Sequence, residues 1–271
     1  PRELRLVYPP RVPPSPHGWL PSPAGAGGGA LAALADRPLA DRPLALIARP
    51  RARDQGEVGC CVSIAVTAAL ELLLRSSPAA RPPVLSPMFH YWQARADRGL
   101  AAPLTLLAGL QAAVRHGICH HRLHPQPITL AGARVAPSEA ALADALAIAG
   151  ARFDPVTGVV RGRFAFARLP DFDRPRHVVA ALAAGRPVLL GFWLTPGYAA
   201  ITPRTPVHGR DLEPRQAIGH AALILGHHPA RGLRVLDAKG PAFADRGAWW
   251  LPHDLLHGPL VQECWTLHRS D

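Results

Sequence analysis

Apolar residues follow two different patterns along this chain, and each pattern predicts a different kind of element. In the first half, the almost uninterrupted apolar run over residues 61–75 predicts a buried helix, because a helix at the surface would keep a polar face. Ser86 and Pro87 suit the N-cap and the first position of a second helix, over residues 85–95. The pattern predicts further helices over residues 104–116, 138–150 and 176–184, each of which ends at a glycine or directly before one.

The second half contains short, continuous apolar runs that are typical of buried strands. A helical first half followed by a stranded second half predicts the α+β class, with two lobes packed against each other. Residues 120–137 look loop-like, residues 151–176 look irregular, and the Pro-rich stretch 195–218 predicts a long loop of the kind that is often functional. The predicted strands cover residues 186–194, 218–226, 234–237, 247–251 and 260–267.

Proline and glycine are frequent in residues 1–50, which also hold a tandem Ala-Asp-Arg-Pro-Leu repeat at 35–44. Such a composition does not build a core, so we expect this N-terminal segment to pack on the surface. The rest of the chain divides into a helical lobe over residues 51–135 and a β-rich lobe over residues 136–271. We expect the two lobes to form one domain together.

The formal net charge of +11 would suit a nucleic-acid-binding protein, but the arrangement of the charges argues against one. Nearly all basic residues are arginines that are scattered along the chain, and Lys239 is the only lysine. We therefore expect no specific nucleic-acid partner, and expect attraction to acidic substrates or surfaces instead. No apolar stretch reaches the roughly 18 residues that a membrane span needs, so none is predicted.

Cysteine is sparse, with Cys60, Cys61, Cys119 and Cys264 as its only positions. The neighbours Cys60 and Cys61 do not readily pair with each other, and no Cys/His spacing fits a zinc site, so we predict neither a metal nor a cofactor. A reduced setting suits this usage better than a disulfide-stapled one. Since no signal peptide is visible, the predicted location is cytoplasmic.

Cys61 has the local sequence of a reactive thiol. Gly56 and Gly59 allow a tight loop that delivers Cys61 to the first turn of the buried helix. There, unpaired backbone N–H groups and the positive end of the helix dipole favour the thiolate, which is the nucleophilic form. Gln55, six residues upstream, can donate its side-chain amide to an oxyanion at the same point.

The second half supplies a candidate base for this thiol. Among 14 histidines, His220 stands out because it interrupts the apolar strand 218–226, where a polar ring is costly unless it is paired. Asp237 follows the next predicted strand, and an aspartate can accept from the imidazole N–H and fix its tautomer. Considered alone, His220 would be a core histidine and Asp237 a turn residue.

These segments resemble the active-site motifs of the papain family of cysteine peptidases, in the same order along the chain. Residues 55–61 resemble the family's Gln-Gly-x-x-Gly-x-Cys, and the strand around His220 and the turn at Asp237 resemble its histidine and asparagine segments. The resemblance spans about residues 18–260 and implies a papain-like two-lobed fold with an antiparallel β-barrel-like lobe. It implies hydrolysis of peptide bonds through a Cys61–His220–Asp237 triad and a thioester acyl-enzyme, with Gln55 in the oxyanion hole.

By the same resemblance, Pro103, Leu104 and Gly219 line the substrate cleft. The family's Gly-Gly loop is missing ahead of Leu104, so pairing with a substrate backbone on that wall is not implied. Residues 1–50 are also shorter than the long inhibitory propeptide of many family members.

The triad departs from the family at its third position. Asp237 stands where the family has asparagine, and Lys239 where it has the tryptophan that shields the histidine. We expect Asp237 to raise the pKa of His220 and so to favour a thiolate–imidazolium pair, with Lys239 tempering that effect.

Two alternatives to a general peptidase follow from these observations. One is a dedicated peptide-maturation or acyl-transfer enzyme of the same fold, for which a cleft closed at one end would argue. The other is a catalytically impaired papain-like protein that binds peptides without cutting them. A peptide or protein is the expected partner in each case, and the oligomeric state is not predicted.

Overall fold

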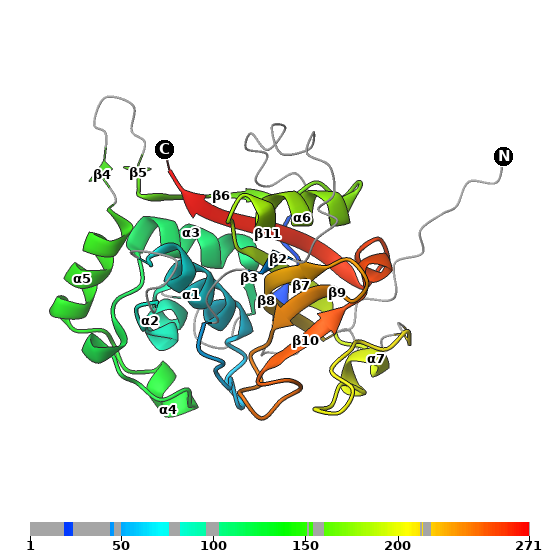
Figure 1. Cartoon of the computed structure of the whole chain (residues 1–271). Helices are drawn as coiled ribbons and strands as arrows, with labels where there is room; N and C mark the ends of the chain where they lie inside the picture. Colours follow the sequence, from blue (N-terminus) through cyan, green and yellow to red (C-terminus); the bar gives the residue numbers. More distant parts are fainter. Residues whose placement is uncertain are drawn as a thin grey trace.

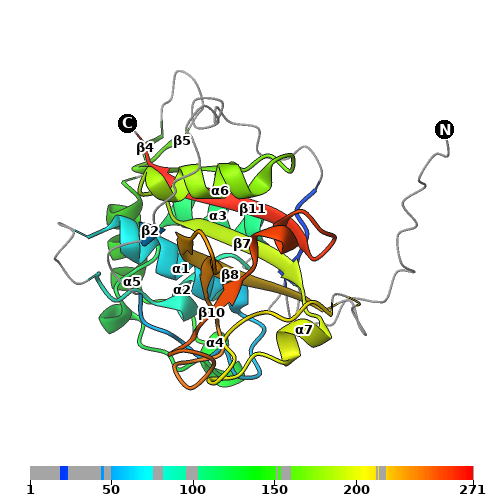
Figure 2. The same cartoon turned by 45° about the vertical axis from the view of Figure 1, so that its right-hand side comes forward.

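The computed structural model of the chain describes residues 19–23, 44–45, 50–75, 82–95, 103–150, 152–153, 160–211, 213 and 218–270. Among these residues, helices α1 to α5 gather on one side of a sheet, and α6 lies on the other side (Figures 1 and 2). The helices are α1 (Cys61–Leu73), α2 (Pro87–Gln93), α3 (Leu106–His116), α4 (Leu130–Ala133), α5 (Glu139–Ala149), α6 (Arg174–Ala183) and α7 (Pro196–Ala199).

The second half forms one large antiparallel sheet whose strand order is β10-β9-β8-β7-β11-β6, with β2 (Leu44–Ala45) pairing with β8 beside this path. This confirms the α+β class. The sheet is open, because its path ends at β10 and β6 and these strands do not close into a barrel. The strands are β6 (Phe164–Arg168), β7 (Val188–Trp193), β8 (Gly219–His228), β9 (Gly232–Leu236), β10 (Ala248–Leu251) and β11 (Val261–Arg269).

Both faces of this sheet are buried, which explains why its central strands read as continuous apolar runs. In β8, Ala221 and Leu223 belong to the core that α1 shares, whereas Ala222 and Ile224 belong to the core beneath α6. Alternate side chains of a strand point to opposite faces, so a strand between two cores needs apolar residues at every position.

The helix boundaries follow the predicted signals. Ser86 Oγ accepts from Phe89 N at 3.2 Å at the start of α2, and Ser138 Oγ accepts from Ala141 N at 3.3 Å at the start of α5. Gly150, which follows α5, has a φ of 57°, a left-handed conformation that glycine adopts without strain.

The expectation that residues 151–176 are irregular was wrong. They contain β4 (Arg152–Phe153), β5 (Val160–Arg161) and β6, and they reach the first turn of α6. Strand β6 is set by its pairing with the distant β11, which a local pattern does not reveal. The expected loop at 120–137 likewise contains the 3-10 helix η2 (His121–Leu123) and α4.

A two-stranded parallel sheet joins the N-terminal segment to the helical side. Strand β1 (Trp19–Leu20) pairs with β3 (Leu104–Thr105), and Trp19 is 1 % exposed. Part of the segment that we expected on the surface is therefore built into the interior. Most of the tandem repeat lies outside the described residues.

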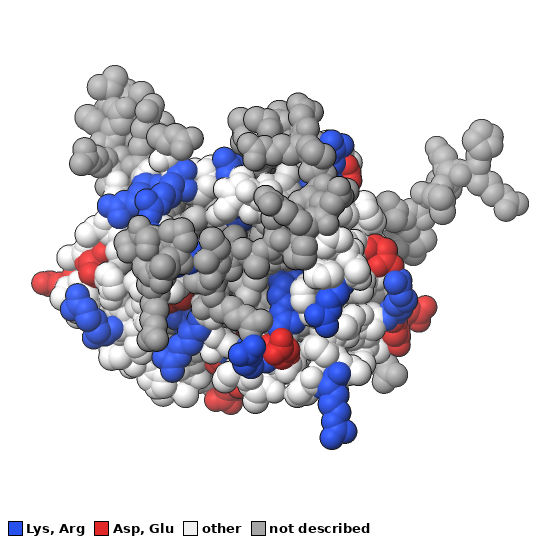
Figure 3. Space-filling model, viewed as in Figure 1, with Lys and Arg blue, Asp and Glu red and all other residues white. Residues whose placement is uncertain are grey.

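Basic side chains lie at separate positions on the face that Figure 3 shows, interspersed with acidic ones. No helix within the described ranges is long and apolar enough to cross a membrane.

Candidate active site

Backbone pairing joins the loop before α1 to the turn after β9. Gln55 N donates to Ala238 O at 2.7 Å, and Gly240 N donates to Arg53 O at 3.0 Å. Two segments that lie about 180 residues apart in the sequence are thereby held side by side. This contact brings the predicted nucleophile loop next to the turn that contains Asp237.

Cys61 is the first residue of α1, and within the described ranges no side chain of its first turn or N-cap neutralises or caps the N-terminus of this helix. The first helical bond runs from Ile64 N to Cys60 O at 3.0 Å, so the backbone N–H of Cys61 has no partner within the helix. The first turn contains no acidic side chain, and Cys60 at the N-cap makes no side-chain cap. The positive end of the dipole therefore acts on negative charge at the Cys61 sulfur or beside it.

His220 is the second residue of β8 and is 2 % exposed. Its Nε2 lies 2.9 Å from Asp237 Oδ1, and the side chain of Cys61 also interacts with its ring. Because Nε2 faces the carboxylate, Nδ1 is the ring nitrogen left for the sulfur. The structure thus brings Cys61, His220 and Asp237 together, with His220 between the other two.

Asp237 is 1 % exposed, and each of its oxygens accepts two hydrogen bonds. Oδ1 accepts from His220 Nε2 at 2.9 Å and from Ala238 N at 2.8 Å. Oδ2 accepts from Tyr198 Oη at 3.0 Å and from Trp249 Nε1 at 2.7 Å. With four donors around two oxygens, the surroundings are those of an ionised carboxylate.

The pKa shifts of the pair agree with this geometry. Burial would by itself lower the pKa of His220, but the charge and hydrogen bond of Asp237, with the contact to Cys61, raise it to about 10. Burial would raise the pKa of Asp237, but the charge of His220 and the bonds from His220, Trp249 and Tyr198 lower it below its usual range. The two shifts favour an imidazolium–carboxylate pair.

Gln55 lies half-buried in the turn ahead of Cys61. Gly56, which follows it, has a φ of 52°, and Val58 N donates to Gln55 O at 3.0 Å, so the backbone turns sharply here. Gln55 Oε1 is buried without a hydrogen-bond partner in the described part of the chain. These backbone contacts hold Gln55 in the turn ahead of α1.

Of the predicted substrate-binding residues, Leu104 and Gly219 lie next to Trp19 of β1, and Pro103 directly precedes Leu104. Leu104 pairs with Trp19 in the β1–β3 ladder and is 0 % exposed, and Pro103 is half-buried just ahead of it. A Cβ at Gly219 would lie 2.2 Å from Trp19 O. The chain's own Trp19 therefore packs against two of the residues at which the sequence placed a substrate.

Trp19 is held in a slot that is built for an indole. A Cβ at Gly191 would lie 2.4 Å from its ring, so only glycine leaves room there. Trp19 Nε1 donates to Glu263 Oε1 at 2.9 Å, and Trp265 Nε1 donates to Glu263 Oε2 at 2.8 Å. Glu263 is 1 % exposed, so both indole donors stabilise a buried carboxylate.

Sequence reasoning missed Tyr198 and Trp249 as partners of Asp237. The only local signal for Tyr198 is Thr195-Pro196, an N-cap followed by a first-turn proline, which starts the short helix α7. Trp249 was predicted only as a residue of the strand over residues 247–251. Lys239, expected to temper the histidine, lies with its Nζ 4.7 Å from the centre of the Tyr198 ring.

The other three cysteines are buried free thiols. Burial raises the pKa of Cys119 and of Cys264 to about 12, and it raises that of Cys60 further. Such thiols are poor nucleophiles. No group of three or more His, Cys, Asp or Glu side chains that could hold a metal occurs within the described ranges.

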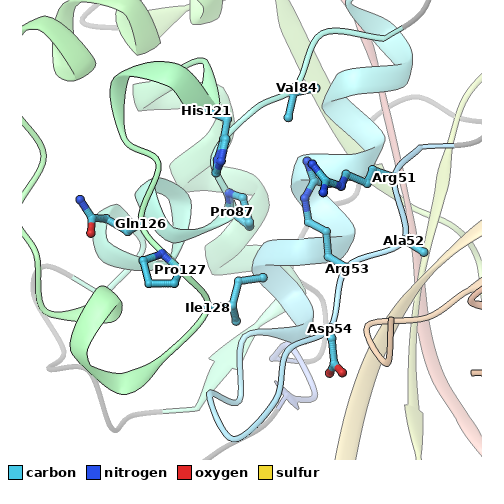
Figure 4. A pocket seen from close by; sticks show the side chains of 10 residues that line it. All are labelled: Arg51, Ala52, Arg53, Asp54, Val84, Pro87, His121, Gln126, Pro127 and Ile128. Carbon is cyan, nitrogen blue, oxygen red and sulfur yellow. The ribbon is translucent and has the colours of Figure 1, made fainter. Parts of the chain in front are cut away.

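A cavity of about 270 Å³ lies between the loop before α1 and residues 126–128 (Figure 4). Arg51, Arg53 and His121 lie around it, and Arg53 is already paired with the buried Glu71 at 2.5 Å. None of the three triad residues lines this cavity. It is separate from the arrangement described above.

Solved structures similar to this chain are cysteine proteases or their proforms. Xylellain, a cysteine protease from Xylella fastidiosa, matches with a TM-score of 0.73 at 19 % identity over 95 % of this chain and 97 % of that one. The proform of the ragweed pollen allergen Amb a 11, a cysteine protease, matches with a TM-score of 0.65 at 17 % identity, over 92 % of this chain and 72 % of that one. Procathepsin L 3 of Tenebrio molitor larval midgut matches with a TM-score of 0.60 at 15 % identity, over 87 % of this chain and 71 % of that one. No family model matches the sequence, and no curated protein does.

The chain therefore has the papain-like fold, the fold of these cysteine proteases. At such low identities the likeness establishes the fold alone, so any statement about chemistry depends on the side chains of this chain.

Proposed function

We propose that this protein is a cysteine peptidase that hydrolyses peptide bonds through Cys61, His220 and Asp237. The observation that supports the proposal most is the buried chain of contacts from the Cys61 side chain through His220 to Asp237, with 2.9 Å between His220 Nε2 and Asp237 Oδ1. A nucleophile, a base and a group that orients the base are the parts that covalent hydrolysis needs.

In the proposed reaction, the Cys61 thiolate attacks the carbonyl carbon of the scissile amide. The tetrahedral oxyanion is stabilised by the Gln55 side-chain amide and the Cys61 backbone N–H. Imidazolium His220 donates its proton to the leaving amine, the C–N bond breaks, and a thioester remains. Neutral His220 then takes a proton from water, which attacks the thioester and releases the acid and the thiol.

The test is hydrolysis of a mixture of internally quenched peptides by the purified chain, with Cys61→Ala as the inactive control. Cleavage that is lost in Cys61→Ala and unchanged in the matched variant Cys119→Ala would support the proposal. If the folded wild-type protein binds the peptides without cleaving them, the peptidase proposal is wrong and the peptide-binding alternative takes its place.

The covered cleft favours a second candidate, the dedicated enzyme of restricted specificity. Trp19 pairs with Leu104 and packs against Gly219, and Glu263 binds its indole, so we expect that a long peptide does not reach these residues while β1 is in place. Such an enzyme would accept few substrates, in trimming or in acyl transfer to an amine that intercepts the thioester.

Trp19→Ala separates the two candidates. If β1 restricts access, the variant should cleave more members of the peptide mixture than the wild type does, and it should do so faster. If the wild type already cleaves long peptides at the rate of the variant, the restricted-specificity candidate is excluded. Thermal unfolding of both proteins shows whether the variant is folded.

A further inference from the structure

The third position of the proposed triad holds Asp237, whereas papain-like sequences have an asparagine there. The two donors around Asp237 Oδ2 explain why an aspartate suits this chain. We propose that Tyr198 and Trp249 form a two-donor clamp that makes this position specific for a carboxylate, so that both act as positioning residues for His220. The catalytic meaning of the clamp rests on the proposed function, whereas its selectivity for a carboxylate does not.

The clamp consists of two neutral donors on one oxygen. Tyr198 Oη and Trp249 Nε1 lie 3.0 and 2.7 Å from Asp237 Oδ2, and all three residues are at most 2 % exposed. Both donors stabilise the charged form of the carboxyl group in a site without competing water. Oδ1 is thereby left to His220 and to the backbone of Ala238.

An asparagine does not fit between these donors. With its amide nitrogen in the place of Oδ2, the NH₂ group would face the N–H of Trp249, which has no acceptor. With the amide turned round, the NH₂ group would face the backbone N–H of Ala238 instead. Tyr198 can rotate its hydroxyl to accept, but neither N–H can, so each orientation leaves a buried pair of donors.

The two donors come from different segments that are fastened to each other. Thr195 Oγ1 accepts from Tyr198 N at 3.3 Å and starts α7. Further along the same loop, Val207 forms a parallel bridge with Trp250, the neighbour of Trp249 on β10. The segments that carry Tyr198 and Trp249 are therefore bound to each other.

Other titratable groups near the clamp are few. Asp237 faces His220 from β8, and Tyr198 and Trp249 also contact the ring of His208, whose pKa burial lowers. Lys239 is exposed, and its Nζ lies over the Tyr198 ring, 4.7 Å from the ring centre. His220 is thus the charged partner of Asp237 among the groups that contact it.

The experiment is a double-mutant cycle between Asp237→Asn and Trp249→Phe, with Trp250→Phe as the matched control. Trp250 is the next residue on β10, is half-buried, and stacks with arginines rather than with Asp237. The measured quantities are the second-order rate of Cys61 alkylation by iodoacetamide and the thermal unfolding temperature of each variant.

If the clamp is correct, Trp249→Phe should change the alkylation rate in opposite directions in the wild type and in Asp237→Asn. Next to Asp237 it should lower the alkylation rate, by about tenfold for a lost charge-assisted bond. In the Asp237→Asn background, itself about 10²–10⁴-fold slower, it should raise the rate by removing the opposed donor. Trp249→Phe should also lower the unfolding temperature less in Asp237→Asn than in the wild type. The control Trp250→Phe should change the rate and the unfolding temperature by the same amount in both backgrounds.

Tyr198→Phe tests the other donor through the pH profile. Loss of its bond raises the pKa of Asp237, so the acid limb of the alkylation profile should move up by about one pH unit. In Asp237→Asn, which has no carboxyl group to titrate, the acid limb should not respond to Tyr198→Phe.

Equal effects of Trp249→Phe on rate and unfolding in both backgrounds would overturn the clamp, as would an unmoved acid limb in Tyr198→Phe. A wild type without any His220-dependent alkylation would instead overturn the proposed function. The clamp would then still be decided by the unfolding temperatures of the cycle, so the two failures are distinguishable.

Discussion

Cys61 and Asp237 belong to one site, but the chain holds them by different means. Cys61 is placed by backbone geometry, as the first residue of a buried helix whose preceding loop pairs with the turn after β9. Asp237 is placed by side chains, with donors from β8, from α7 and from β10 on its two oxygens.

This difference has consequences for what the sequence can reveal and for how substitutions act. A backbone-placed group depends on local residues, so a motif of seven residues describes it. A group placed by side chains depends on residues that are far apart in the chain, so single substitutions at a distance reach it. The predictions below test the contrast, beginning with the largest effect.

The largest loss of kcat is expected at Asp237, which side-chain donors hold in place. Asp237→Ala removes the acceptor that orients His220, and it leaves the donors of Tyr198 and Trp249 buried without a partner. We expect kcat to fall about 10²–10⁴-fold with a small change in KM. Steady-state kinetics on a cleaved peptide measures this, and an unchanged kcat would contradict the role of Asp237.

On the backbone-placed half, Gln55→Ala should cost less. One oxyanion donor is lost while the Cys61 backbone N–H remains, so kcat should fall about 10²–10³-fold. Gln111→Ala, at an exposed position on α3, is the matched control and should leave kcat unchanged. Turnover of Gln55→Ala at the wild-type rate would remove Gln55 from the oxyanion hole.

The ion pair between the loop before α1 and α1 itself should affect stability and not kcat. Arg53 Nη2 lies 2.5 Å from Glu71 Oε1 of α1, and both are buried, so Arg53→Ala leaves an uncompensated buried charge. We expect the free energy of unfolding to fall by about 3–5 kcal/mol, measured by urea titration. Arg122→Ala, at an exposed position, should change it by less than about 0.5 kcal/mol.

The smallest effect is expected at α5. Ser138 Oγ caps this helix through Ala141 N at 3.3 Å, and its loss should cost about 1 kcal/mol. Alkylation of Cys61 should not change, because none of the contacts described in the site involves α5. A changed alkylation rate in Ser138→Ala would show that the site depends on the helical side more widely than its geometry indicates.

The sequence predicted the helix that begins at Cys61, the capped helix at Pro87 and the strand of His220, and the structure places the proposed triad residues Cys61, His220 and Asp237 near one another. These elements have strong local signals: caps, glycine turns and one polar residue in an apolar run. It did not predict β6, the β1–β3 pairing or the donors of Asp237, because each depends on a partner far away in the chain. The burial of Leu104 under Trp19 is of the same kind.

The most direct test of the central claim is the pH dependence of Cys61 alkylation by iodoacetamide in the wild type and in His220→Ala, followed by peptide mass spectrometry. The raised pKa of His220 means that its positive charge supports the thiolate below about pH 10 and is lost as the pH rises through that value. We therefore predict rapid labelling already at pH 5–6 in the wild type, and its loss in His220→Ala. Slow labelling in both proteins that increases only near pH 8.5, as for an ordinary thiol of about that pKa, would contradict the ion-paired nucleophile.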